Sequence, residues 1–121
     1  QSEIVRLLLE ANADMDKADQ KGVTPLLAAA YTGQLEVARL LVEANADMDK
    51  ADQTGTTPVY SAAGKGLSEI VQLLLEANAD KDKANQNGAT PLCSAAENGD
   101  LEVVRLLQES NQDQSYPSRW S

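Results

Sequence analysis

Short apolar segments alternate with polar ones along this 121-residue chain. An alanine-rich apolar run at residues 26–30 precedes a second apolar run over residues 35–44, and a polar, turn-like segment follows over residues 46–54. In the second run the apolar residues recur at helical spacing, which places them on one side of a helix. These positions are Leu35, Val37, Ala38, Leu40 and Leu41. The pattern therefore predicts two short helices separated by a turn and followed by a loop.

The whole pattern returns every 33 residues. The Thr-Pro pair stands at Thr24-Pro25, Thr57-Pro58 and Thr90-Pro91. Three further markers keep the same spacing: Asn12-Ala13-Asp14, Asn45-Ala46-Asp47 and Asn78-Ala79-Asp80; Gly22, Gly55 and Gly88; Gly33, Gly66 and Gly99. Several independent markers in one register, without an insertion, establish an internal repeat.

Each marker has a physical role within the unit. Gly22 lies where a tight turn needs a positive φ. Thr24 can cap the first helix with its hydroxyl, and Pro25 suits the first helical position because its missing N–H costs nothing there. Gly33 ends the first helix and Asn45 the second, since asparagine is the best residue after glycine for a left-handed cap. One such unit cannot bury its apolar side alone, so we expect neighbouring units to stack around a continuous core.

The repeated stretches carry a distinctive motif. They read Gly22-Val23-Thr24-Pro25-Leu26, Gly55-Thr56-Thr57-Pro58-Val59 and Gly88-Ala89-Thr90-Pro91-Leu92. They continue as Ala29-Ala30-Tyr31-Thr32-Gly33, Ala62-Ala63-Gly64-Lys65-Gly66 and Ala95-Ala96-Glu97-Asn98-Gly99. Over residues 1 to about 113 the chain closely resembles the ankyrin repeat family. The resemblance implies an all-α fold, an ankyrin-repeat solenoid of stacked helix-turn-helix units with hairpin-like loops.

The register divides the chain into five segments. We expect a partial repeat with only a second helix and loop at 1–21, ankyrin repeats at 22–54 and 55–87, a final repeat at 88–113, and a tail outside the repeat at 114–121. Because the first helix is absent before residues 2–10, we expect a piece of a longer array, monomeric but able to associate end to end through that uncapped helix. Tyr116 and Trp120 belong either to a frayed end or to a cap over the last repeat.

The sequence departs from the family pattern at two sets of positions. The histidine that the family has after Thr-Pro-Leu is replaced, so its loop hydrogen bonds must be missing or supplied by other groups. The replacements are Leu27, Tyr60 and Cys93. The glycine that ends the second helix in the family is asparagine throughout, which we expect to end the helices at small cost. These asparagines are Asn12, Asn45, Asn78 and Asn111.

The net charge limits the kinds of ligand that this chain can bind, and the cysteine content indicates the kind of compartment in which it folds. The formal net charge of −9 disfavours nucleic acid and anionic membranes, which need clustered Lys and Arg. The preferred interpretation of this charge is solubility, and the second interpretation is a basic partner. Cys93 is the only cysteine, which excludes an intramolecular disulfide and fits an intracellular, cytoplasmic location. No apolar run approaches the roughly 20 residues that a membrane helix needs.

Candidate catalytic and metal-binding groups are few. The chain has no histidine, and Cys93 is interpreted as a structural thiol rather than a nucleophile. The spacing Asp14-x-Asp16-x-x-Asp19 resembles that of calcium-binding carboxylates. An EF-hand loop, however, needs a bidentate Glu at its twelfth position, and Pro25 stands there. A solvated loop is therefore the preferred interpretation. We expect no enzyme activity, no cofactor and no metal.

The resemblance implies that a partner protein docks on the loop tips and the exposed, concave side of the first helices. Most of the residues at these positions vary between the repeats: Gln20, Lys21, Val23, Tyr31 and Thr32; Gln53, Thr54, Thr56, Gly64 and Lys65; Gln86, Asn87, Ala89, Glu97 and Asn98. Tyr31 is the best single anchor candidate. The sequence thus predicts a protein-interaction scaffold. The alternatives are an architectural spacer without a specific ligand and an engineered ankyrin binder.

Overall fold

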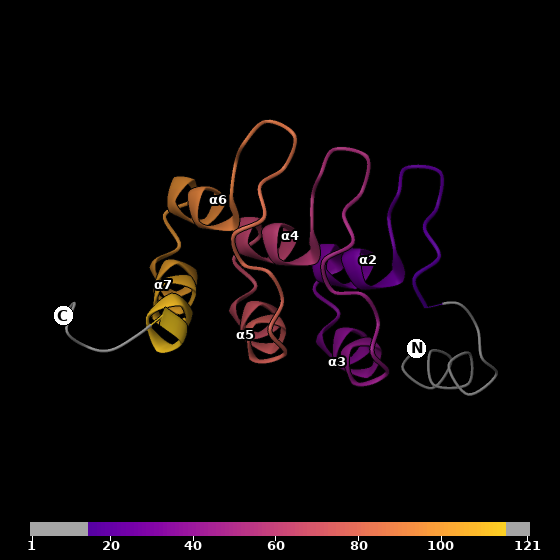
Figure 1. The fold of residues 1–121 in the computed structure, drawn as a ribbon, viewed down its shortest axis with the longest axis horizontal. Coiled ribbons are helices and arrows are strands. Elements are labelled where there is room, and N and C mark those ends of the chain that lie inside the picture. Colours follow the sequence, from indigo (N-terminus) through magenta and orange to yellow (C-terminus); the bar gives the residue numbers. More distant parts are fainter. Residues whose placement is uncertain (1–14, 116–121) are drawn as a thin grey trace.

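Three units of the same shape lie side by side in the computed structural model (Figure 1), which describes residues 15–115, with side chains as far as Glu109. Each unit is a projecting loop, a first helix, a turn and a second helix. The first helices are α2 (Pro25–Thr32), α4 (Pro58–Gly64) and α6 (Pro91–Glu97). The second helices are α3 (Leu35–Glu43), α5 (Ser68–Glu76) and α7 (Leu101–Ser115). The described residues contain no strand, so the expected all-α architecture is confirmed.

The first helices begin as the sequence predicts. In α2 the hydroxyl of Thr24 accepts a hydrogen bond from the backbone N–H of Leu27 at 3.2 Å, and Pro25 follows the cap. Thr57 and Thr90 cap α4 and α6 in the same way. Each cap satisfies one of the N–H groups that a helix start leaves without a partner, which is why these short helices begin at a fixed residue.

The second helices end as predicted in two units and differently in the third. Asn45 and Asn78 both have a φ of 69°, which confirms the left-handed stop. The expectation that Asn111 also ends its helix was wrong, because α7 continues to Ser115. In the first two units a buried alanine follows the asparagine and holds the chain against the core. The third unit has Gln112 at that position, so the same small residue is not available to fix the stop.

Small side chains let the helices approach closely and form one continuous core. The alanines at the centre are fully buried: Ala30, Ala38, Ala62, Ala63 and Ala95. The middle first helix, α4, packs against both α2 and α6. Burial falls at the last unit, where Leu92 is 37% exposed while its equivalent Leu26 is 1% exposed. Each unit is therefore covered by the one that follows it.

Backbone hydrogen bonds connect successive loops. Each loop closes on itself like a hairpin, as in the second unit, where Asp52 N donates to Thr56 O at 3.0 Å. Between loops, Gln53 N donates to Lys21 O and Gln86 N donates to Thr54 O, both at 3.0 Å. These backbone bonds fix the register between units.

The aspartates that invited a calcium interpretation connect the loops as well. Asp16 Oδ1 accepts from Asp47 N at 2.8 Å, and Asp49 Oδ1 accepts from Asp80 N at the same distance one repeat later. The lysines follow the same rule, since Lys50 Nζ donates to Asp16 O at 3.0 Å. Asp14 lies outside the described residues, as do the partial-repeat helix at 2–10 and the proposed capping residues Tyr116 and Trp120.

Gly55 and Gly88 allow the loop-to-loop contact to be tested separately from backbone strain. Both have a φ of 84°, but a Cβ on Gly55 would meet Gln86 N at 2.8 Å, whereas a Cβ on Gly88 would meet nothing within 4 Å. We expect Gly88→Ala to lower the free energy of unfolding by about 1 kcal/mol through strain alone. Gly55→Ala should cost about 2–4 kcal/mol, because the next loop must also move.

Urea unfolding followed by circular dichroism measures both losses. Equal losses for the two variants would contradict the claim that the loops are in stabilising contact.

Candidate functional site

An open groove of about 570 Å³ lies between the first two units, along α2 and α4. Its surface is mostly apolar, with a few polar groups at its rim. Figure 1 shows these helices side by side in the row of first helices. Pockets that bind ligands commonly combine such a volume with a few placed polar groups. The lining residues are Lys21, Val23, Leu27, Ala28, Tyr31, Thr32, Asp52, Thr56, Tyr60, Ser61, Gly64 and Lys65.

Two side chains bridge the groove from opposite helices. Tyr31 on α2 is 59% exposed, a large fraction for an aromatic residue. The ammonium of Lys65, at the end of α4, lies 4.1 Å from the centre of its ring. This cation–π contact is worth roughly 0.5–1 kcal/mol at an exposed site. The pair is therefore weak enough for a partner to rearrange it.

Ser61 supplies an unusual polar group in this groove. The residue is 7% exposed, and among the described residues its Oγ is buried without a hydrogen-bond partner. Buried hydroxyls are nearly always satisfied, so such an atom calls for an explanation. The equivalent residue is Ala28 in the first unit and Ser94 in the third. The groove thus contains a buried hydroxyl that no other group of the described residues satisfies.

Asp52 is held in place by its own loop. Its Oδ1 accepts from Thr54 N at 2.9 Å, Thr54 Oγ1 at 2.8 Å and Thr56 N at 3.0 Å. Burial raises the pKa of Asp52, but the hydrogen bonds from Thr54 and Thr56 outweigh it and lower the pKa below its ordinary value. Asp52 is therefore an ionised side chain that stabilises the hairpin loop by accepting hydrogen bonds from it.

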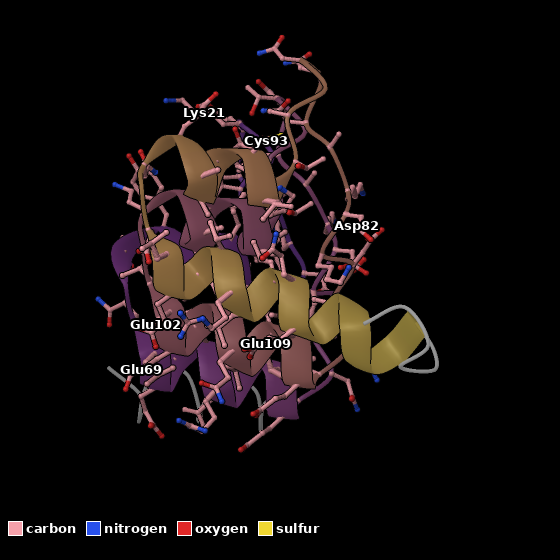
Figure 2. The ribbon with its side chains drawn as sticks, turned by 90° about the vertical axis from the view of Figure 1, so that its left-hand side faces the viewer. Lys21, Glu69, Asp82, Cys93, Glu102 and Glu109 are labelled. Carbon is pink, nitrogen blue, oxygen red and sulfur yellow. The ribbon has the colours of Figure 1, made fainter. Side chains whose placement is uncertain are left out.

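The two lysines that line the groove are not held by a carboxylate. Among the described residues, neither Lys21 nor Lys65 takes part in an ion pair. The acidic residues of the second helices repeat along another face of the molecule. In Figure 2, Lys21 lies beside the first helices, while Glu69 and Glu102 lie beside the second helices. The groove is thus less acidic than the net charge of −9 suggests.

The residues predicted to bind a partner are all on the surface, with Val23, Thr56, Gly64 and Ala89 half-buried and the others exposed. The structure brings together seven of them around the groove: Lys21, Val23, Tyr31, Thr32, Thr56, Gly64 and Lys65. The remaining predicted residues lie outside it: Gln20, Gln53, Thr54, Gln86, Asn87, Ala89, Glu97 and Asn98.

Several of these outlying residues have structural partners. Gln53 Nε2 donates to Gln20 O at 2.6 Å, which joins two loops. Asn98 Nδ2 donates to Gly64 O, which joins the ends of α6 and α4. Thr54 Oγ1 bonds to Asp52, within its own loop. Some of the residues predicted from the sequence to bind a partner therefore hold the loops and repeats together instead of lining the groove.

Sequence reasoning missed five residues of the groove: Leu27, Ala28, Asp52, Tyr60 and Ser61. A signal was present for four of them, which occupy two repeat positions, because the residue type changes between repeats at both positions. Leu27 and Tyr60 are equivalent, and so are Ala28 and Ser61. Both positions lie inside the first helix, where burial was the simpler expectation.

Cys93 is exposed and lies outside the groove. Thr90 Oγ1 donates to its Sγ at 3.3 Å, and this side-chain bond, together with the backbone bond to Thr90, lowers the pKa of the thiol. The described residues contain no group of three or more acidic or cysteine side chains that could hold a metal ion.

Because the hydroxyl of Ser61 is buried without a partner among the described residues, its removal should stabilise the protein. Ser61→Ala removes a buried group without a partner and should raise the free energy of unfolding by about 1 kcal/mol. The melting temperature should rise by roughly 4 °C. Ser94→Ala is the matched control and should change stability by less than about 0.5 kcal/mol. If Ser61→Ala is destabilising, the hydroxyl has a partner in the free protein.

Comparison with known families agrees with this architecture. A family model for three consecutive ankyrin repeats matches residues 1–85 and again residues 45–117. Comparison with curated proteins gives no significant match. None of the helices in the described part of the chain is long and apolar enough to cross a membrane. The matched segments span most of the 121 residues, and the chain therefore belongs to the ankyrin repeat family.

Proposed function

We propose that this protein binds a partner protein through the groove between α2 and α4. Ankyrin repeats are generally protein–protein interaction modules, and the family is typically a non-enzymatic scaffold. The observation that supports this location is the open, mostly apolar groove with the exposed Tyr31 at its edge. Tyrosine is enriched among residues that dominate binding energy, since it offers a large contact area and a polar end.

The groove suits a short inserted segment of the partner better than a flat surface. Specific interfaces bury roughly 800 Å² on each partner, so contacts must extend beyond the groove. The exposed loop tips beside it, including Gln20 and Gln53, provide polar area for the rim of such an interface. The net charge of −9 disfavours a nucleic-acid ligand, and the single cysteine fits a reducing, intracellular compartment.

A second candidate function is that of an architectural spacer. The observation in its favour is that several of the predicted binding residues form hydrogen bonds between repeats, as with Gln53 on Gln20 and Asn98 on Gly64. A spacer would need these contacts and would not need the groove. The two functions therefore predict different consequences for substitutions in the groove.

A capture experiment with matched variants separates the two functions. The immobilised protein is compared with a groove variant, Lys21→Glu with Tyr31→Ala, by quantitative mass spectrometry of bound proteins. The control carries Asn87→Glu with Glu97→Ala, which are the same repeat positions outside the groove. We expect at least one direct partner whose capture falls about tenfold in the groove variant and less than twofold in the control.

Circular dichroism establishes that both variants remain folded. Bound proteins that are the same for all three baits, or absent from all three, would favour the spacer.

A further inference from the structure

We propose that the groove takes the side chain of a tyrosine from an acidic peptide segment of the partner, with the tyrosine hydroxyl bonding to Ser61 Oγ. This inference rests on the proposed function and adds the chemistry of the ligand. Three features of the groove support it: its aromatic walls, the unsatisfied hydroxyl in its lining, and two lysines without ion pairs.

The walls of the groove fit an aromatic ring. Tyr31 and Tyr60 come from adjacent first helices, and Leu27 adds apolar surface. Aromatic pairs gain beyond their buried area when the rings meet offset or edge to face. Gly64 occupies the position equivalent to Tyr31 and Glu97 and adds no side chain of its own, although the Ser94 side chain packs against it. The open volume of the groove is about 570 Å³. The groove therefore has room for a large planar side chain.

Ser61 explains why that side chain should end in a hydroxyl. A purely apolar ligand would bury the Oγ further and leave it unsatisfied, whereas a phenol can donate to it or accept from it. The Oγ is covered in the free protein. Lys65 is one helical turn beyond Ser61 on α4 and reaches Tyr31 on α2, so this pair spans the groove near Ser61. Tyr31 and Lys65 are both exposed, and exposed side chains change rotamer fast enough for a ligand to displace this pair.

Charge complementarity selects acidic neighbours for the tyrosine. Lys21 and Lys65 line the groove without ion pairs among the described residues, while Asp52, the one carboxylate in the lining, is bonded to its own loop. Carboxylates beside the tyrosine can pair with the two ammonium groups, and Lys65 would exchange its contact with Tyr31 for an ion pair. Basic neighbours would place like charges together at the rim.

Peptide selection tests the inference without assuming a sequence. A phage library with nine random residues is selected on the full chain and counter-selected on Ala28→Trp, in which the exposed Ala28 becomes large enough to fill the groove. We expect enriched peptides to contain tyrosine with Asp or Glu within two residues. Enrichment of phenylalanine or leucine in place of tyrosine, or of Lys and Arg neighbours, would overturn the inference while leaving a peptide-binding groove. The absence of any groove-dependent peptide would overturn the proposed function as well.

A double-mutant cycle then tests the hydroxyl contact. The enriched peptide and its Tyr→Phe version are titrated against the wild type and Ser61→Ala by fluorescence anisotropy. Loss of the peptide hydroxyl should weaken binding about five- to tenfold on the wild type and less than twofold on Ser61→Ala. Ser94→Ala is the matched control and should keep the full discrimination, because it lies outside the groove. If the wild type and Ser61→Ala prefer the tyrosine peptide over its Tyr→Phe version by the same factor, the tyrosine hydroxyl does not bond to Ser61.

The lysine contacts have their own control. Lys21→Gln with Lys65→Gln should weaken binding of the acidic peptide about tenfold and reduce its dependence on salt. Lys50→Gln with Lys83→Gln removes the same charge outside the groove, where both lysines donate to the preceding loop, and should change the affinity less than twofold. Equal effects of the two pairs would mean that only the net charge matters, which would contradict specific pairing in the groove.

Discussion

The hydrogen bonds between successive loops are the constraint on which the rest of this structure depends. Gln53 N on Lys21 O and Gln86 N on Thr54 O place equivalent backbone atoms one repeat apart. Once the loops are in this register, the first helices lie close enough for Ala62 and Ala63 to be completely buried. Short helices of this kind are marginal in isolation, so the stacking supplies most of their stability.

The same register creates the groove. It brings Tyr31 opposite Lys65 and leaves Gly64 at the position that would otherwise carry a side chain like that of Tyr31. Different sequence positions therefore determine the fold and the site. The threonine, proline, alanine and loop aspartate positions that stabilise the stacking recur in each unit, while most residues of the groove change from unit to unit. The interface between α2 and α4 contains the groove, while the interface between α4 and α6 has the equivalent loop-to-loop hydrogen bond.

The sequence predicted the fold well because its determinants are local and repeated. The caps at Thr24, Thr57 and Thr90 follow from chemistry within each unit. The site was predicted only in part, because a groove depends on how side chains from two units meet. Variation pointed to Tyr31, but it could not reveal that Ser61 would be buried without a partner. It also could not distinguish Asn98, which bonds to the neighbouring unit, from a residue available to a ligand.

The most direct test of the site is a ¹⁵N NMR titration of the full chain with a groove-selected peptide or a segment of a captured partner. The groove as binding site predicts that the largest amide shifts lie in residues 19–32 and 52–65, around α2, α4 and their loops. The second helices α3, α5 and α7 should shift little. Largest shifts along these second helices, near Glu69 and Glu102, would contradict it and would place the interaction on the acidic face of the molecule.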